Sequence, residues 1–221
     1  MDFIFMFTRE DQTVEDCLDV FDIIMQTGVK HLGFKDIGVP RETLVALNDR
    51  IKASGGVSYM EVVSTTSEAC LNSARSAVEI GVDRLLGGTQ AEAMLDVLQG
   101  SGIDYFPFPG RPAGHPTKLG GTPVQVAADC RRFEALGCAG VDLLAYRATE
   151  AEPLELVRAA RQALKGELII AGSVGSPARV QELAKAGVDA FTVGSAAFDG
   201  SFSPRKGSLR SQLTDILAAC T

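Results

Sequence analysis

The feature that most constrains this chain is a short unit that recurs along its length. A stretch with helical periodicity ends in glycine, an apolar residue follows, and a short apolar run comes next. Glycine can take the left-handed conformation that closes a helix, and a β-branched residue after it suits the start of a buried strand. Each copy therefore marks a junction from helix to strand. Copies begin at Gly28, Gly81, Gly102, Gly140 and Gly187, with looser copies at Gly56 and Gly166.

The spacing of these junctions predicts eight strand–helix units. We expect strands to start at residues 3, 29, 57, 82, 103, 141, 167 and 188, because every interval accommodates one strand, one helix and two short loops. Eight near-equal alternating units predict a single-domain (β/α)8 barrel, or TIM barrel, over residues 1–221, with a doubly wound open sheet as the rival. Residues suited to begin helices support this division: Thr13, Thr65, Thr89, Thr122, Thr149 and Ser176 as caps, and Pro123 and Pro177 at first helical positions.

Composition narrows the class of function. The formal net charge is −7 and Lys and Arg form no runs, which argues against nucleic acid or an anionic membrane as the partner. No apolar run approaches the roughly 18–20 residues of a membrane span. The five cysteines are odd in number and form no C-x-x-C motif, so we expect buried thiols in a reducing cytoplasm. A barrel of this length also suits assembly into a homo-oligomer through its helix faces.

Barrel geometry sorts the polar residues into two groups. Chemistry lies at the carboxyl ends of the strands, whereas the helix-to-strand turns at the other end serve stability. Four acids come directly after the apolar residue that follows a helix-closing glycine. We therefore expect these acids to be structural and to lie at the amino ends of the strands: Asp83, Asp104, Asp142 and Asp189.

Two glycine-containing turns follow the last two predicted strands. Gly-Ser-Val-Gly-Ser occupies residues 172–176, and Gly-Ser-Ala occupies residues 194–196. Both turns leave backbone N–H groups free, and the second opens a helix, so a dianion can bind there without Lys or Arg. The alternative is that the glycines only permit tight turns. We predict a phosphate site formed by the backbone of Gly172, Ser173, Gly175, Gly194 and Ser195.

Residues 168–198, which contain both turns, resemble the phosphate-binding end of the ribulose-phosphate-binding barrel superfamily. That superfamily includes isomerases, synthases, epimerases, aldolases and decarboxylases. The resemblance implies a phosphorylated small-molecule ligand. Two of its local patterns are absent here: the Asp-x-Lys of some decarboxylases on the third strand, and the apolar-Lys-apolar sequence of keto-deoxy-phosphogluconate aldolase on the sixth.

The second and third predicted strands carry the strongest catalytic candidates, Lys35 and Glu61, with Asp36 beside the first. A lysine at a strand end can form a Schiff base with a ketone or polarise a carbonyl group as a cation. A carboxylate within a barrel strand is costly unless it is paired, so Glu61 is a candidate base, or a structural partner of Lys35. Within the resemblance, some decarboxylases bind Mg²⁺ through acids in roughly the places of Asp36 and Glu61. The cofactor is therefore either none or Mg²⁺, with Asp36 and Glu61 as the candidate ligands.

The unit between residues 103 and 140 is longer than its neighbours, and residues 107–121 account for the excess. A long loop on the active face of a barrel is typically a lid or substrate clamp, although a rigid connector is the alternative. Its cations Arg111, His115 and Lys118 are candidates to neutralise a substrate anion on closure. Arg147, at the end of the sixth strand, can bind a substrate carboxylate or pair with Glu150.

These features predict an enzyme of sugar-phosphate metabolism. An anchored phosphate, a cation for the carbonyl oxygen and a carboxylate base suit a lyase of aldolase or decarboxylase type, acting on a phosphorylated sugar or keto acid through an enolate. A sugar-phosphate isomerase or epimerase needs the same groups and is the first alternative. A non-catalytic phosphometabolite-binding protein is the second. A nicotinamide dehydrogenase is disfavoured, because Gly-x-Gly-x-x-Gly does not follow the first strand.

Overall fold

The junctions between helix and strand lie close to the positions that the repeat predicts. The computed structural model describes residues 1–64 and 66–220. Its main sheet is eight-stranded and parallel, in the order β10-β11-β12-β1-β4-β5-β6-β7, and each strand begins within two residues of the expected start. The strands are β1 (Asp2–Met6), β4 (His31–Lys35), β5 (Val57–Glu61), β6 (Arg84–Leu86), β7 (Asp104–Phe106), β10 (Gly140–Leu143), β11 (Glu167–Ile170) and β12 (Ala190–Val193).

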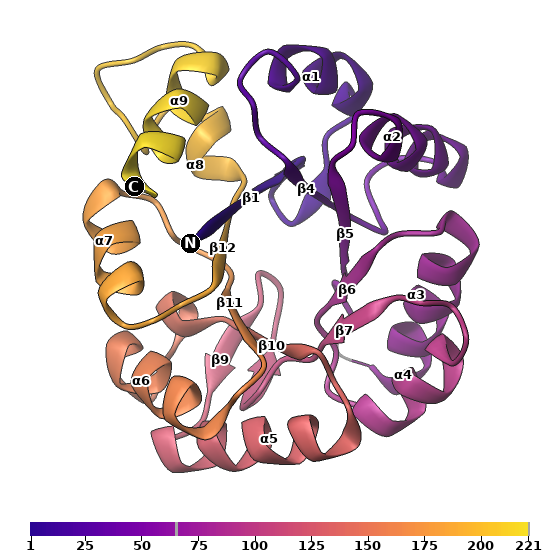
Figure 1. The fold of residues 1–221 in the computed structure, drawn as a ribbon, viewed down its shortest axis with the longest axis vertical. Helices are drawn as coiled ribbons and strands as arrows, with labels where there is room; N and C mark the ends of the chain where they lie inside the picture. The colour runs from indigo at the N-terminus through magenta and orange to yellow at the C-terminus, as the bar shows by residue number, and fades with distance from the viewer. Residues whose placement is uncertain (65, 221) are drawn as a thin grey trace.

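The two outer strands of this order, β7 and β10, meet and close the sheet. The Ala139 backbone N–H donates to the Tyr105 carbonyl at 3.1 Å, and the Asp142 N–H donates to the Pro107 carbonyl at 3.0 Å. Figure 1 shows the resulting ring of strands inside a ring of helices. Closure confirms the (β/α)8 barrel over the open sheet.

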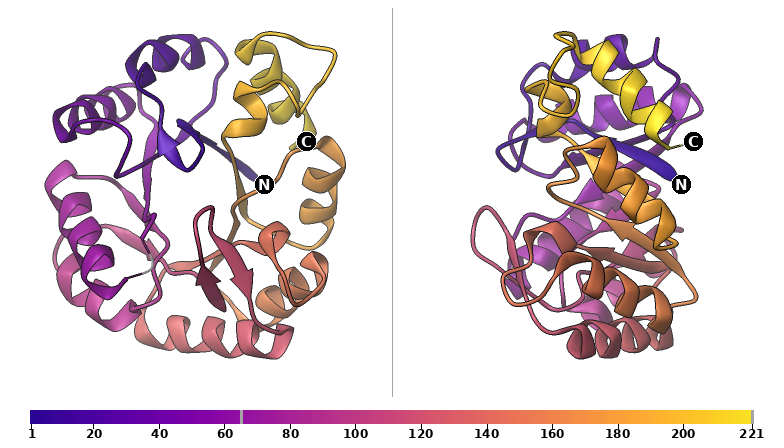
Figure 2. Two further views of the ribbon diagram at one scale, coloured as in Figure 1. Left: turned by 180° about the vertical axis from the view of Figure 1, so that it is seen from behind. Right: turned by 90° about the vertical axis from the view of Figure 1, so that its left-hand side faces the viewer.

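Helices follow the strands and cover the outside of the barrel (Figures 1 and 2). Two of the expected N-caps are confirmed, because the Thr122 and Ser176 hydroxyls accept backbone N–H groups of α5 and α7, and each helix starts with proline. The helices are α1 (Cys17–Ile24), α2 (Arg41–Ala53), α3 (Ser67–Ile80), α4 (Ala91–Leu98), α5 (Pro123–Leu136), α6 (Pro153–Ala163), α7 (Pro177–Lys185), α8 (Ser195–Phe198) and α9 (Leu209–Ala219).

The other predicted caps differ. Helices α1, α4 and α6 begin after Asp16, Gln90 and Glu152, so Thr13, Thr89 and Thr149 do not cap them. The hydroxyls of Thr13 and Thr149 instead bond to backbone carbonyls of distant strands. The predicted cap Thr65 lies outside the described residues.

The hydrophobic core has two parts. One part fills the space between the strands and the helices. It contains four buried cysteines, which are free thiols as expected: Cys17, Cys70, Cys130 and Cys138. The other fills the inside of the barrel, where a Cβ on Gly33 would collide with the Met6 sulfur. Its members are Ile4, Met6, Tyr59, Leu86, Phe106, Ile169 and Ala190.

Two small hairpins extend the carboxyl ends of the strands. The first joins β2 (Thr8–Arg9) to β3 (Gln12–Thr13), and the second joins β8 (Arg111–Ala113) to β9 (Lys118–Gly120). In the right-hand view of Figure 2, the β8–β9 hairpin projects from the end of the barrel opposite the N-terminus. The excess residues of the long unit therefore form a hairpin at the carboxyl ends of the strands.

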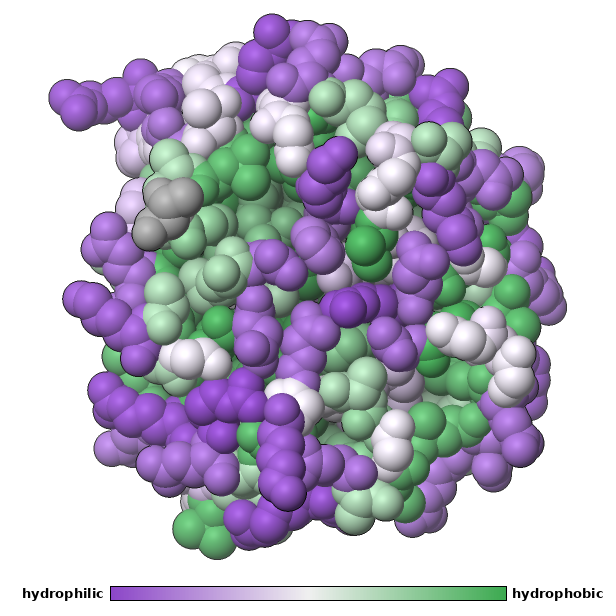
Figure 3. All heavy atoms as spheres, viewed as in Figure 1, coloured by the Kyte–Doolittle hydropathy of each residue, from purple (hydrophilic) through white to green (hydrophobic). Residues whose placement is uncertain are grey.

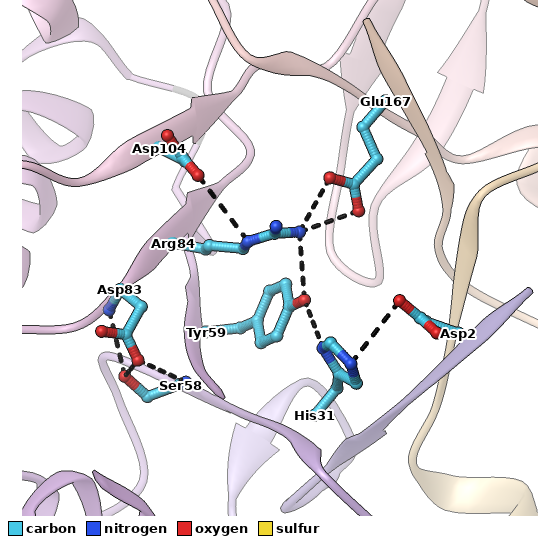
Figure 4. A network of polar contacts seen from close by, with 8 residues as sticks. All are labelled: Asp2, His31, Ser58, Tyr59, Asp83, Arg84, Asp104 and Glu167. Carbon is cyan, nitrogen blue, oxygen red and sulfur yellow. Dashed lines mark hydrogen bonds and ion pairs between the residues drawn. The ribbon is translucent and has the colours of Figure 1, made fainter. Parts of the chain in front are cut away.

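A polar network closes the amino end of the barrel (Figure 4). Arg84 Nη1 donates to both carboxylate oxygens of Glu167 at 2.8 and 2.9 Å and to the Tyr59 hydroxyl at 3.2 Å. The Tyr59 hydroxyl lies 2.8 Å from His31 Nδ1, and His31 Nε2 lies 3.5 Å from an Asp2 oxygen. Because these groups satisfy one another, the charged residues stabilise the floor of the barrel.

Three of the four acids expected at this end are there. Asp83 accepts the backbone N–H and the hydroxyl of Ser58, and Asp189 pairs with Arg161 at 2.7 Å. Asp104 lies 3.9 Å from Arg84. Figure 3 shows that hydrophilic side chains are spread over this end of the molecule. Within the described ranges, none of the helices combines the length and hydropathy of a membrane span.

Candidate functional site

A cavity of about 330 Å³ opens at the carboxyl ends of the strands. It brings together side chains from the second and third strands of the barrel and the glycine-containing turns after the last two. Its lining is Met6, Thr8, Asp11, Lys35, Glu61, Arg147, Gly172, Ser173, Val174, Gly175, Thr192, Val193, Gly194, Ser195, Ala196, Asp199 and Ser201.

Lys35 and Glu61 meet because their strands are in register. Residue 35 of β4 pairs with residue 61 of β5, so both side chains lie on the inner side of the barrel. The Lys35 ammonium lies 3.3 Å from a Glu61 oxygen, and only 4% of the lysine is exposed. Thr13 fixes the end of β4, because its hydroxyl donates to the Lys35 carbonyl at 2.8 Å and accepts the Lys35 N–H at 2.9 Å.

Asp11 is a member of this cluster that the sequence analysis missed. It lies in the turn of the β2–β3 hairpin with φ of +59°, and its Oδ1 atom lies 2.8 Å from the Lys35 ammonium. Arg147 contacts the same carboxylate, at 3.3 Å through Nη2 and 3.4 Å through Nη1. An acid in a tight turn is usually exposed to solvent, so its place just after the first strand was the only signal in the sequence, and it did not suffice to select Asp11.

The charges of the cluster control its protonation. Burial alone would lower the pKa of the Lys35 ammonium, but the Glu61 and Asp11 carboxylates raise it above its ordinary value. Burial alone would raise the pKa of Asp11, but Lys35 and Arg147 lower it. Lys35 is therefore a cation and Asp11 an anion at neutral pH.

Asp142 is also in the barrel interior, so the expectation that it lies at the amino end is wrong. It is fully buried, and among the described residues neither carboxylate oxygen has a hydrogen-bond partner. Its strand position pairs with Ile169 of the interior cluster. Burial, and then the Glu61 charge, raise the pKa of Asp142 well above its ordinary value, so the group favours the neutral acid.

The predicted phosphate turns lie in the same cavity as Lys35 and Glu61. Gly172 has φ of +74° and packs against the Arg147 side chain, so a Cβ there would be strained and would collide with the guanidinium stem. Ser173, which follows it, also has positive φ, at +60°. In the described part of the chain, the backbone N–H groups of residues 172–176 and 194–196 donate to no protein acceptor. These amides are available to an anion.

The structure does not bring Asp36 to this cavity. Successive residues of a strand point to opposite sides, so Asp36 points outward where Lys35 points inward. Its carboxylate accepts a hydrogen bond from Ser73 of α3 and lines a separate cavity, and burial raises the pKa of Asp36. Asp36 and Glu61 therefore do not form a shared Mg²⁺ site. Among the described residues, no cluster of three or more His, Cys, Asp or Glu side chains is placed to hold a metal ion.

The three predicted cations of the long loop also lie outside the cavity. Arg111 is exposed and pairs with Glu150 at 2.6 Å, and the His115 and Lys118 side chains are exposed. The hairpin reaches the site through its backbone, because the Thr117 carbonyl accepts from Arg147 at 3.3 Å. Arg147 is thus held by Asp11 and Thr117, while Glu150, its expected alternative partner, binds Arg111.

The fold and this cavity define a (β/α)8 barrel with a polar cavity, lined by free backbone amides and charged side chains, at the carboxyl ends of its strands. Residues 111–203 match the profile of the family described as histidine biosynthesis protein. No curated protein sequence matches the chain significantly.

Solved structures share the whole barrel at low sequence identity. Orotidine 5'-phosphate decarboxylase from Pyrococcus horikoshii has a TM-score of 0.70 at 12% identity, over 99% of this chain and 98% of that one. Thiamine phosphate pyrophosphorylase from Pyrococcus furiosus has a TM-score of 0.68 at 12% identity, over 99% and 95%. A structure described as native KDPGal has a TM-score of 0.66 at 11% identity, over 100% and 92%. At these identities the matches show that the chain shares the (β/α)8 barrel fold of these proteins.

Proposed function

We propose that this protein is a lyase that acts on a phosphorylated sugar or keto acid through an enolate-type intermediate. One observation carries the proposal: a buried Lys35 ammonium and the Glu61 carboxylate, 3.3 Å apart, line the same cavity as the free amides of the two glycine turns. A phosphate on those amides would hold the carbon skeleton of the substrate in front of both groups. The names of the structural neighbours, which include a decarboxylase and a pyrophosphorylase acting on phosphorylated compounds, support this choice.

The protonation of the cluster favours one mode of carbonyl activation. A Schiff base requires a neutral amine, whereas Glu61 and Asp11 stabilise the Lys35 ammonium. In the proposed reaction, Glu61 takes the proton of a hydroxyl group β to the carbonyl, and the carbon–carbon bond breaks. The electron pair of the broken bond forms an enolate, and the Lys35 ammonium stabilises the enolate oxygen. Glu61 then returns the proton to the enolate carbon, so that both fragments leave as carbonyl compounds. We also propose that this step needs no metal ion, since Lys35 supplies the positive charge between the acids.

A sugar-phosphate isomerase or epimerase remains the alternative function. The same two groups suit it, because Glu61 can take a proton from the carbon next to the carbonyl while Lys35 stabilises the same kind of enolate. The products separate the two reactions. Cleavage yields two carbonyl compounds from one substrate, and isomerisation yields a single phosphate ester of unchanged mass.

The experiment incubates the protein with aldose and ketose phosphates of three to six carbons in D2O, with and without a chelator. Phosphorus NMR then follows the phosphate esters and their products, and proton NMR follows the exchange of carbon-bound hydrogen for deuterium. We expect turnover or deuterium uptake that survives the chelator and falls by about 100-fold or more in Glu61→Gln and Lys35→Met. Lys30→Met, which changes an exposed lysine just before the same strand, is the matched control and should keep full activity.

Two results would contradict the proposal. Binding of phosphate esters without turnover or deuterium uptake would favour the non-catalytic binding protein. Mass added at Lys35 after borohydride treatment in the presence of a ketose phosphate would show a Schiff base in place of the cation.

A further inference from the structure

Both cations that line the cavity in the described part of the chain already have carboxylate partners. The Lys35 ammonium lies 2.8 Å from Asp11 and 3.3 Å from Glu61. The Arg147 guanidinium contacts the same Asp11 carboxylate at 3.3 Å and a backbone carbonyl at 3.3 Å. Each cation is therefore already neutralised by a carboxylate, which disfavours binding of a permanently charged second group of a ligand beside it.

The cavity carries more acids than bases. Asp11, Glu61 and Asp199 line it against Lys35 and Arg147, which leaves a formal charge of −1 when all five are ionised. The side chains of Asp11 and Glu61 are each only 9% exposed, so water screens their charge weakly. A substrate carboxylate placed beside Lys35 would therefore face carboxylates at close range. A phosphate bound to the backbone amides of residues 172–176 and 194–196 would instead be paired with N–H donors that have no protein acceptor among the described residues.

The rest of the lining suits a ligand with hydroxyl groups. Thr8, Thr192 and Ser201 place hydroxyls on the wall, and Glu61 can accept from a substrate hydroxyl. The cations expected to neutralise a substrate carboxylate are elsewhere, because Arg111, His115 and Lys118 are exposed on the β8–β9 hairpin.

We propose that the site selects ligands whose negative charge lies on the phosphate alone, with an uncharged hydroxylated remainder, and that it discriminates against phosphorylated keto acids and other phosphorylated carboxylates. The inference rests on the proposed function, because it assumes that the glycine turns bind phosphate. It narrows the substrate class to sugar monophosphates.

The test compares glycerol 3-phosphate with 3-phosphoglycerate by titration calorimetry on the intact protein at pH 7.5 and constant ionic strength. The two probes share a three-carbon skeleton and a phosphate, and they differ in a hydroxymethyl group against a carboxylate. We expect glycerol 3-phosphate to bind at least tenfold more tightly. Glu61→Gln should reduce this ratio at least threefold, because it removes one carboxylate from the wall and one partner from Lys35. Glu150→Gln, which changes an exposed carboxylate outside the cavity, should leave the ratio unchanged.

The outcomes separate this inference from the proposed function. Equal binding of the two probes, or tighter binding of 3-phosphoglycerate, would overturn the charge selectivity and leave the phosphate site standing. Failure of both probes to bind would overturn the phosphate site itself, and the selectivity with it.

Discussion

Gly172 shapes the first of the two glycine turns that we propose bind phosphate. Its φ of +74° and its contact with Arg147 both require the absence of a Cβ atom. Alanine at this position would cost about 1–2 kcal/mol in backbone strain alone and would also displace the Arg147 side chain. A side chain at residue 172 would therefore change the turn, the direction of its amides and the position of the guanidinium together.

We predict that Gly172→Ala lowers the affinity for glycerol 3-phosphate at least tenfold, as measured by calorimetry. The matched control is Gly81→Ala, since Gly81 has φ of +77° with no atom within 4 Å of an added Cβ and ends α3 at the amino end of the barrel. Both variants should lose stability, but Gly81→Ala should keep its affinity. Equal affinities of the two variants would show that the turn at residue 172 does not bind the ligand.

Asp142 gives a prediction on stability, because its carboxyl group is fully buried without a partner. Burial raises its folded-state pKa above the value of about 3.9 in the unfolded chain. Between about pH 3.9 and the folded-state pKa, the folded state therefore binds more protons than the unfolded state. Over that range, Asp142 lowers the free energy of unfolding by up to about 1.4 kcal/mol for each unit of pH rise.

Asp142→Asn removes the ionisation at nearly constant size, so the free energy of unfolding of the variant should rise relative to the wild-type protein between pH 5 and pH 8. Urea unfolding at several pH values measures the difference. A difference that does not change with pH would mean that Asp142 is ionised in the folded protein.

Part of the site could be predicted from single residues, and part could not. Lys35 and Glu61 end two successive parallel strands, so their meeting followed from strand order alone. Asp142 follows a glycine and a valine as Asp83 and Asp189 do in their own units, yet its environment is different. The pairing of β10 with β11 begins at Gly140, because the absence of a Cβ atom lets the Gly140 backbone lie close to Glu167. Asp142 is therefore within the strand, and its side chain lies inside the barrel. That approach depends on a neighbouring strand, which the local pattern does not contain.

At the scale of elements, strand starts were easier to predict than helix starts. The repeat located the seven strands after the first, and the expected left-handed conformation is present at Gly28, Gly81, Gly102 and Gly187. It is absent at Gly56, Gly140 and Gly166. A threonine cap depends on where its side chain finds a partner. The Thr13 hydroxyl donates to a carbonyl at the end of β4, and the Thr149 hydroxyl donates to a carbonyl of β9. Neither threonine therefore caps the helix that its spacing predicted.

The β8–β9 hairpin also gives a prediction, because it supports the site through its backbone while its charged side chains point away. We expect the triple variant Arg111→Gln, His115→Asn and Lys118→Gln to bind glycerol 3-phosphate within about twofold of the wild-type affinity, as exposed charges contribute little. Arg147→Gln, measured in parallel, should lose at least tenfold. A loss of tenfold or more in the triple variant would instead show that the hairpin cations close over the ligand.

At the scale of the whole molecule, the two ends of the barrel differ in how their polar groups are paired. The network of Arg84, Glu167, Tyr59 and His31 satisfies its charges at the amino end (Figure 4). The carboxyl end keeps free amides and a buried carboxyl group without a partner. Free amides and an unpaired buried carboxyl group beside charged side chains, at the carboxyl ends of barrel strands, are typical of a ligand site.

A crystal structure of the protein with glycerol 3-phosphate tests the central claim most directly. The account predicts a phosphate group with oxygens about 3 Å from backbone nitrogens of residues 172–176 and 194–196. It also predicts that the carbon chain extends toward Lys35 and Glu61. A phosphate bound elsewhere, such as at Arg111 on the hairpin or Arg84 at the floor, or a carbon chain directed away from Lys35, would contradict it.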